Sequence, residues 1–247
     1  MSEKGNQPLE SLQGKATSTG KEKAFDIFTV LGHDLKSPLN AVEAYLDILR
    51  GRVLGDALDP YMTILDNSVA RLHQMRELIT DVVDWSKIRQ SQPGRVLAIT
   101  DLSKTARLML DRYIQQAQAR NIIISADIED GMTMKAAPDE IELLVRHLMD
   151  NALRYNKDNG SVCLTLKRAG DYIILKVADT GIGMSEEDLS RLFEEFVRIK
   201  NSKTQDIRGT GLGLAIVRNI VELYQGTVSV RSEPDAGTTL IVELPCE

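Results

Sequence analysis

Apolar residues recur at helical spacing through the first third of the chain. Between residues 24 and 50 they form a broad stripe, which predicts one long amphipathic helix. The centre of the stripe repeats every seven residues, at Phe28, Leu35, Val42 and Leu49. Glycines and a proline in GRVLGDALDP, residues 51–60, predict a break. A second helix is predicted from about residue 61 to residue 87.

The second helix carries two apolar rows in a coiled-coil-like register. One row contains Leu65, Leu72 and Ile79, and it alternates with Tyr61, Ser68, Met75 and Val82. Two long helices joined by a short loop form an antiparallel hairpin, but one hairpin cannot bury stripes of this width. Pairing two copies gives a four-helix bundle, so the pattern predicts a homodimer.

The period changes after SQPGR, residues 91–95, a turn cluster typical of a domain boundary. Beyond it, strand-length apolar runs alternate with helical stretches. Predicted strands cover 95–99, 121–128, 132–136 and the hairpins 161–179 and 226–245, and predicted helices cover 101–119 (capped by Thr100 or Asp101), 139–155, 185–195 and 211–225. We therefore expect a linker at 1–23, a helical domain at 24–90 and an α+β domain at 91–247.

Composition and charge limit which binding partners and which cellular location we expect for the chain. The net charge of −6 over 247 residues leaves no basic excess for nucleic-acid phosphates. Cys163 and Cys246 match no disulfide or metal-ligand spacing, which favours a reducing compartment. No apolar run approaches the roughly 18 residues that cross a bilayer, and no signal peptide opens the chain. We expect a cytoplasmic chain without nucleic-acid or membrane contact of its own, which could still be the cytoplasmic portion of a membrane-bound sensor.

Two glycine-rich segments and one polar helix end are candidates for phosphate chemistry. DTGIGM (179–184) follows a predicted strand, and RGTGLGLAIV (208–217) runs into a predicted helix, where backbone N–H groups can approach phosphates. Their spacing matches neither the dinucleotide fingerprint nor a Walker loop. In HLMDNALRYN (147–156), Asn151 offers a hard oxygen ligand for Mg²⁺, Arg154 a positive charge and Tyr155 a flat surface for a base. Taken singly, ordinary tight turns and a polar helix end remain open alternatives.

Six motifs together resemble sensor histidine kinases of two-component systems, over Ala24–Pro245. HDLKSPLNAV (33–42) is similar to the H box, DNALRYN (150–156) to the N box, DTGIGM to the G1 box, LFEEFVR (192–198) to the F box, GTGLGL (209–214) to the G2 box and DAGTT (235–239) to the last glycine turn. The resemblance implies a dimerisation and histidine-phosphotransfer domain, followed by an α/β sandwich of the Bergerat ATP-binding type.

The same resemblance assigns ATP and Mg²⁺ to the second domain. Asp179 would accept the adenine amino group, Asn151 would hold Mg²⁺, and residues 199–208 would form a lid hinged at Phe193 and Phe196. The implied nucleotide-binding residues are Asn151, Arg154, Tyr155, Asp179, Gly181, Gly183, Arg198, Gly209, Thr210, Gly211, Leu212 and Gly213. One departure lies at His147, where family members usually carry asparagine and the related ATPases a catalytic glutamate.

His33 is the expected phosphate acceptor on the first helix. It lies on a polar face with Lys36, Asn40, Glu43, Asp47 and Arg50, away from the apolar seam. A neutral imidazole is the nucleophilic form, and Asp34 would orient it by accepting a hydrogen bond from the other ring nitrogen. The resemblance implies onward transfer to an aspartate of a response regulator receiver domain, with Ser37 as a residue for regulator dephosphorylation.

Three functions fit the residues. The first is an ATP-dependent protein-histidine kinase; the alternatives are a Bergerat-fold ATPase or protein-serine kinase, and a catalytically silent dimeric scaffold. The long hairpin with His33–Asp34 disfavours the ATPase and serine-kinase reading. Intact Asn151, Asp179 and glycines disfavour the scaffold.

Pro38 yields a testable expectation about the first helix. It lacks a backbone N–H and clashes with the carbonyl of Asp34, which favours a bend just after His33. If this weak point lets the helix flex, Pro38→Ala should alter the ratio of kinase to phosphatase activity, measured with a phosphorylated regulator. An unchanged ratio contradicts the idea.

Overall fold

The structure is a computed structural model that describes residues 35–51, 59–89, 95–199, 204, 207 and 209–246. His33, Asp34 and most of the predicted lid lie outside these residues. The chain divides into two compact units, Met1–Leu78 and Ile79–Glu247.

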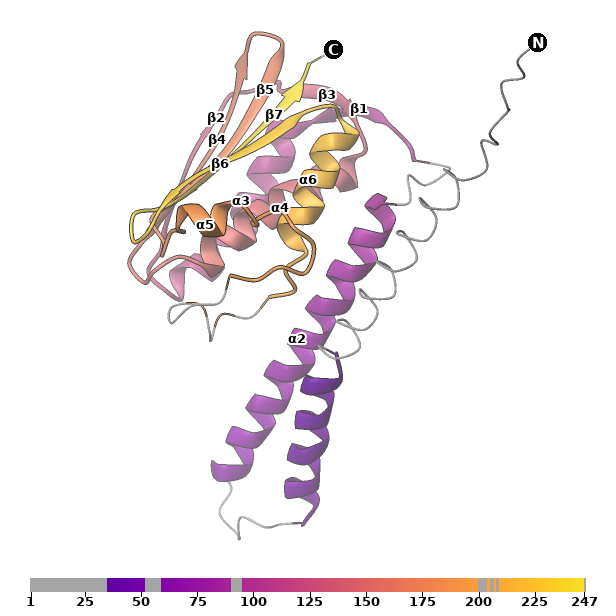
Figure 1. The fold of residues 1–247 in the computed structure, drawn as a ribbon, viewed down its shortest axis with the longest axis vertical. Coiled ribbons are helices and arrows are strands. Elements are labelled where there is room, and N and C mark those ends of the chain that lie inside the picture. Colours follow the sequence, from indigo (N-terminus) through magenta and orange to yellow (C-terminus); the bar gives the residue numbers. More distant parts are fainter. Residues whose placement is uncertain are drawn as a thin grey trace, which may run out of the picture. The chain divides into compact units, whose positions relative to one another are not determined.

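The first unit contains a helix at 35–51 and the start of α2 (Asp59–Arg89), which lie side by side in Figure 1. The expected seam is confirmed at Val42, which is only 7% exposed. The polar face is also confirmed where it is described, because all its members are exposed, namely Lys36, Asn40, Glu43, Asp47 and Arg50. Pro38 is helical and buried, but the carbonyl of Asp34 lies outside the described residues, so the predicted bend stays a prediction.

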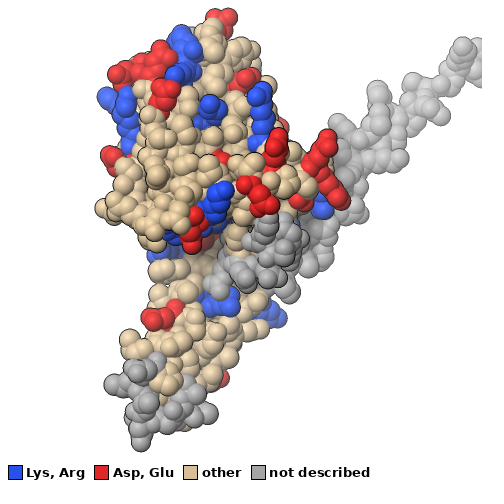
Figure 2. Space-filling model, turned by 90° about the vertical axis from the view of Figure 1, so that its left-hand side faces the viewer, with Lys and Arg blue, Asp and Glu red and all other residues tan. Residues whose placement is uncertain are grey.

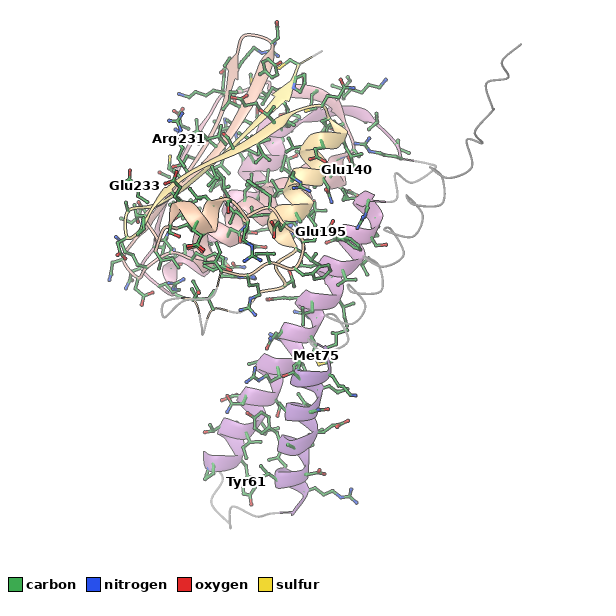
Figure 3. The ribbon with its side chains drawn as sticks, in the orientation of Figure 1. Tyr61, Met75, Glu140, Glu195, Arg231 and Glu233 are labelled. Carbon is green, nitrogen blue, oxygen red and sulfur yellow. The ribbon has the colours of Figure 1, made fainter. Side chains whose placement is uncertain are left out.

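The two apolar rows of α2 have different environments. Tyr61 and Met75 are half-buried on the side that faces the other helix (Figure 3), and Ser68 between them is buried. The hydroxyl of Ser68 donates to the carbonyl of Ile64, which satisfies it within the helix. Large side chains of the other row and its flank are 41–55% exposed: Met62, Leu65, Val69, Leu72 and Ile79. The single hairpin therefore leaves one apolar stripe uncovered, as its width predicted.

The second unit contains two sheets. β1 (Ala98–Asp101) pairs antiparallel with β3 (Thr133–Ala136). The larger sheet has the order β2-β4-β5-β7-β6, in which only β2 and β4 are parallel. Its strands are β2 (Ile123–Ile128), β4 (Ser161–Ala169), β5 (Tyr172–Asp179), β6 (Thr227–Glu233) and β7 (Gly237–Pro245). The predicted strand at 95–99 is wrong in its bounds, because pairing starts where Ala98 meets Ala136.

Three helices cover one face of the larger sheet (Figure 1): α3 (Leu102–Gln118), α4 (Pro138–Arg154) and α6 (Gly213–Leu223). Asp101 caps α3 by accepting from the backbone N–H of Lys104, as expected. The core lies between sheet and helices, where Leu148, Leu164 and Ile216 are fully buried. Each such side chain contributes about 1.5–3 kcal/mol, so this layer positions the helices.

The predicted helix at 185–195 is wrong in its length. Only α5 (Glu186–Leu189) is helical, started by the Ser185 hydroxyl that accepts from the N–H of Asp188, and turns follow. Phe196 has a left-handed φ of 62°, and its N–H donates to the carbonyl of Gly211 at 3.1 Å. This contact fixes Phe196 against the distant G2 segment, which local sequence could not reveal.

The side of the unit that Figure 2 shows, where the sheet lies, carries acidic and basic side chains in small mixed groups. One pair on the strands is Lys167–Asp127, with 2.5 Å between the charged atoms. Cys163 and Cys246 are free thiols. Among the described helices, none combines the length and hydrophobicity of a membrane span.

Arg120 closes the C-terminal end of α4. Its guanidinium donates to the carbonyls of Leu153 at 2.8 Å and Asn156 at 2.6 Å, and it pairs with Asp158 at 2.8 Å. Leu153 and Asn156 are buried; the Leu153 carbonyl also accepts from the N–H of Asn156, whereas the Asn156 carbonyl has Arg120 as its donor among the described residues. Arg120 thus holds the chain where α4 ends.

We expect Arg120→Ala to lower the free energy of unfolding by about 1–3 kcal/mol, because it leaves the buried Asn156 carbonyl without its donor. Urea unfolding followed by the fluorescence of Trp85, the single tryptophan, measures the change. The matched control is Arg107→Ala, which removes an exposed hydrogen bond to the Ile128 carbonyl and an ion pair to an Asp130 side chain that is 91% exposed, and it should cost less than about 1 kcal/mol. Equal losses in both variants would contradict the role of Arg120.

Candidate functional site

One face of α4 carries the polar residues expected from the sequence. His147, Asn151, Arg154 and Tyr155 follow at spacings of four, three and one, so they share a side of the helix and its end. The apolar residues of α4, among them Leu144, Leu148 and Met149, are fully buried in the core. Pro138 starts the helix, and Arg154 lies in its last turn, where a cation complements the dipole.

The G2 segment, residues 209–213, runs along this polar face in the opposite direction. A methyl group on Gly209 would lie 2.9 Å from Nη1 of Arg154, and one on Gly213 would lie 3.1 Å from Nδ1 of His147. Leu212 is fully buried, which anchors the segment in the core. The structure therefore brings the N box and the G2 box together.

Thr210 of the G2 segment is fixed by α2. Its hydroxyl donates to Oδ2 of Asp81 at 2.7 Å and accepts from the N–H of Leu212 at 3.0 Å. Burial raises the pKa of Asp81, and the hydrogen bond from Thr210 opposes that shift. Asp81 was not among the site residues predicted from the sequence. A carboxylate among the mostly apolar positions of this helix could have indicated a buried polar contact.

Two further contacts within the second unit hold the end of α2. Arg146 pairs with Asp84 at 2.7 Å, and Nε1 of Trp85 donates to Oε1 of Glu195, a residue labelled in Figure 3, at 3.1 Å. The Trp85 ring also meets Phe196 edge to face, with 6.1 Å between ring centres. Asp81, Asp84 and Trp85 follow the spacing of one helix face, so one side of α2 contacts both the G2 and F boxes.

The G1 turn begins where β5 ends at Asp179. Oδ1 of Asp179 accepts from the N–H groups of Gly181 at 2.8 Å and Thr238 at 3.2 Å. Ile182 N–H donates to the carbonyl of Tyr155 at 3.1 Å, which joins the turn to the end of α4. Burial raises the pKa of Asp179 to about 6, and the two N–H donors oppose it.

Gly183 shows why this turn needs glycine. It has a left-handed φ of 61°, and a side chain there would overlap the carbonyl of Glu233. The N–H of Asp235 in turn donates to the carbonyl of Ile182 at 2.8 Å. The DAGTT turn therefore packs against the G1 turn and holds it by this hydrogen bond.

The F box lies against the G2 segment. Phe193 and Phe196 are partly buried against the core, consistent with a hydrophobic hinge. Nη2 of Arg198 donates to the carbonyl of Ile207 at 2.6 Å, which closes a loop between them. Residues 200–203, 205, 206 and 208 of the predicted lid lie outside the described residues.

The structure gathers most of the predicted nucleotide-binding residues into one region. Asn151, Arg154 and Tyr155 lie beside the G2 segment, and the turn from Asp179 to Gly183 meets the end of α4. Ser37 is an exposed helical residue of the first unit. In the part of the chain that is described, no three His, Cys, Asp or Glu side chains form a metal-binding group.

Two families match the two parts of the chain. Residues 26–91 match the His Kinase A (phospho-acceptor) domain. Residues 136–247 match the histidine kinase-, DNA gyrase B-, and HSP90-like ATPase family. The first match includes His33, and the second includes the N, G1, F and G2 boxes.

Individual proteins show similarity over nearly the whole chain. Sensor histidine kinase RcsC of Escherichia coli (strain K12) is 27% identical over 248 residues, which cover 98% of this chain and 25% of RcsC. Histidine protein kinase DivJ of Caulobacter vibrioides is 30% identical over 216 residues, 87% of this chain and 36% of DivJ. The chain thus spans about a quarter to a third of these relatives.

The fold also resembles that of a kinase whose structure was solved in complex with its regulator. Histidine kinase ThkA, in complex with response regulator protein TrrA, superposes with a TM-score of 0.68 at 20% identity. The alignment covers 98% of this chain and 68% of that chain.

The raised pKa of Asp179 predicts a pH-dependent stability. In the folded state the Asp179 carboxyl stays protonated up to about pH 6, whereas an ordinary aspartate has a pKa of 3.8. The free energy of unfolding therefore falls as pH rises between these two values. Asp179→Asn keeps Oδ1 as an acceptor without the charge, and should raise the free energy of unfolding at pH 8 by about 1–2 kcal/mol after allowance for partial exposure. The gain should vanish near pH 4.

Urea unfolding without nucleotide, at several pH values, measures this difference. Asp130→Asn, at an exposed carboxylate, is the control and should show little change. A loss of stability in Asp179→Asn at pH 8, or a gain independent of pH, would show that burial does not penalise the Asp179 carboxylate.

Proposed function

The chain belongs to the histidine kinases of two-component systems, and we propose that it transfers the γ-phosphoryl group of ATP to His33 and then to an aspartate of a response regulator. One observation carries the proposal: the N, G1 and G2 boxes converge around the polar face of α4, in a chain that also has a phospho-acceptor domain. The complex of ThkA with TrrA supports a regulator as the partner.

Asp179 and Tyr155 form the adenine end of the proposed site. The carboxylate has one oxygen held by two backbone N–H groups, so its second oxygen is available to accept from the adenine amino group. Tyr155 lies at the C-terminal end of α4 beside the G1 turn, where its ring can contact the base. An adenine is thereby distinguished from a guanine, which presents a carbonyl at that position.

Asn151 is the proposed Mg²⁺ ligand. It lies one turn before the end of α4, it is half-buried, and no described residue pairs with its side-chain amide. Nucleotide-bound Mg²⁺ needs only one or two protein oxygens, because phosphates and water complete its shell. A single amide therefore fits the ion, which when bound would neutralise the charge of the phosphates.

The G2 segment and Arg154 would enclose the phosphates. Gly209, Thr210, Gly211, Leu212 and Gly213 pass close to α4 and end at the first turn of α6, whose N–H groups favour an anion. Arg198 from the F box lies nearby in the chain and would add charge when the lid closes. These residues position the triphosphate, and the transfer itself requires little more than alignment and neutralisation.

At the acceptor, Nε2 of His33 would attack the γ-phosphorus in line. An N–P bond forms, the bond to the bridging oxygen of ADP breaks, and ADP leaves. Asp34 would accept a hydrogen bond from Nδ1 and stabilise the positive ring. The resulting phosphoramidate is labile and can pass its phosphoryl group to a regulator aspartate; Ser37, which is exposed, is the proposed residue for dephosphorylating that regulator.

A homodimer is the proposed assembly. Apolar side chains are 41–52% exposed on both helices of the hairpin, at Leu65, Leu72 and Ile79 of α2 and at Leu39 and Leu46 of the other helix. A second copy of the hairpin would cover both in a four-helix bundle.

Incubation with γ-labelled ATP tests the proposed reaction. We expect label that is lost in acid and stable in base, absent from His33→Gln and reduced at least tenfold in Asp179→Asn and Asn151→Ala. Acid-stable label would indicate a serine kinase, ADP release without label an ATPase, and neither a silent scaffold. Each of these three outcomes contradicts the proposal.

A further inference from the structure

Ser232 lies beside the G1 turn but belongs to none of the six motifs. It is on β6 between Arg231 and Glu233, two exposed residues that Figure 3 labels. Because successive side chains of a strand point to opposite faces, Ser232 points away from theirs, and it is half-buried. The register pairs it with Thr238 of β7. Ser232 is therefore next to the residue whose N–H donates to Asp179.

The hydroxyl of Ser232 joins two segments of the site. It accepts from the N–H of Met184, the last residue of the G1 turn, at 2.9 Å, and donates to the carbonyl of Gly237 at 2.9 Å. The hydroxyl of Thr238 is also 2.9 Å away. Since Ser232 gives its one proton to the Gly237 carbonyl, the Thr238 hydroxyl must donate to Ser232. One proton and two lone pairs of Ser232 are then all in use.

The peptide bond between Gly237 and Thr238 connects Ser232 with Asp179. Its carbonyl accepts from Ser232, and its N–H donates to Oδ1 of Asp179 at 3.2 Å. The C=O and N–H of a trans peptide are held in one plane and point in opposite directions. A hydrogen bond that fixes the carbonyl therefore also aims the N–H at the carboxylate.

Gly237 explains why this peptide needs an external contact. It has a positive φ of 108°, and a side chain there would overlap the backbone carbonyl of Asp179. Glycine thus lets the peptide approach Asp179 closely, but it also leaves the backbone the greatest freedom to rotate. The hydrogen bond from Ser232 restricts that rotation.

We propose that Ser232 is a positioning residue for base recognition, because it orients the Gly237–Thr238 peptide so that one oxygen of Asp179 is held and the other faces the adenine amino group. The inference rests on the proposed ATP binding and deepens it, since it names a residue outside the motifs that sets the preference for adenine. Ser232 acts through Asp179 and does not itself touch the nucleotide.

Two substitutions that differ only in a hydroxyl test the proposal. Ser232→Thr and Ser232→Val add side chains of nearly the same shape, both suited to a strand. We expect Ser232→Val to weaken a non-hydrolysable ATP analogue about 3- to 10-fold, as for one lost hydrogen bond, and a GTP analogue less than about twofold. Ser232→Thr should keep most of the preference for the ATP analogue. Calorimetry on the full chain with Mg²⁺ measures both nucleotides.

The pH dependence of binding is a second readout. Burial raises the pKa of Asp179 to about 6, and the N–H donors on Oδ1 oppose that rise. Loss of the Thr238 donor raises the pKa further, and a proton on the second oxygen prevents it from accepting. The pH at which half of the ATP-analogue binding is lost should therefore be about 0.5 to 1 unit higher in Ser232→Val than in Ser232→Thr. A residue that only stabilised the fold would not move this pH.

Two further variants complete the design. Ser232→Ala removes the hydroxyl without adding volume, and it gives the same comparison with the unmodified chain if Ser232→Val does not fold. Ser229→Val is the matched control, because Ser229 is an exposed residue of the same strand. It should leave the preference for the ATP analogue unchanged.

An unchanged preference in folded Ser232→Val, or in Ser232→Ala where the valine variant does not fold, would overturn the inference. So would an equal weakening of both nucleotides, which indicates a general distortion of the G1 turn, or an equal loss of preference in Ser232→Thr and Ser232→Val. An unmodified chain that binds neither nucleotide, or that does not prefer the ATP analogue, would instead overturn the proposed function. The two failures are therefore distinguishable.

Discussion

The burial of α4 between the five-stranded sheet and its neighbouring helices is the constraint on which the site depends. Leu144, Leu148 and Met149 lose all contact with water, and each contributes more than a polar contact on the surface could. Once these side chains are inward, the helical period leaves His147, Asn151 and Arg154 at the edge of the core. The polar face is thus a consequence of the apolar one.

Close backbone approach is the second requirement, and it depends on the first. The G1 and G2 segments can lie against the end of α4 only where no Cβ intervenes, as at Gly181, where a side chain would overlap the carbonyl of Tyr155, and at Gly209, where it would lie 2.9 Å from Nη1 of Arg154. Hydrogen bonds from Ile182 to Tyr155 and from Phe196 to Gly211 then fix both segments. A helix held less firmly would give these short loops no stable surface to bind.

Much of the fold follows from the local sequence, because hydrophobic periodicity and turn-forming residues act over only a few positions. The bounds of α4 and α6, the hairpin from β4 to β5 and the Asp101 cap were all close to expectation. The bounds of two elements were predicted wrongly. After Leu189 the chain forms turns, in which the N–H groups of Arg191, Leu192 and Glu194 donate to carbonyls three residues earlier. The first strand begins only at Ala98, which meets Ala136 of β3.

The sequence by itself predicted the residues of the candidate site from motif spacing, among them Asn151, Asp179 and the glycines, and the structure brings the segments that carry them together. It also determined that a single hairpin leaves an apolar stripe uncovered. Only the tertiary structure decided that α2 reaches the G2 and F boxes through Asp81 and Trp85. It alone decided that His147 is buried and neutral, with no hydrogen-bond partner for its Nε2 in the part of the chain that is described. The physical reason is that desolvation and hydrogen-bond partners come from segments far apart in the chain, which no local pattern encodes.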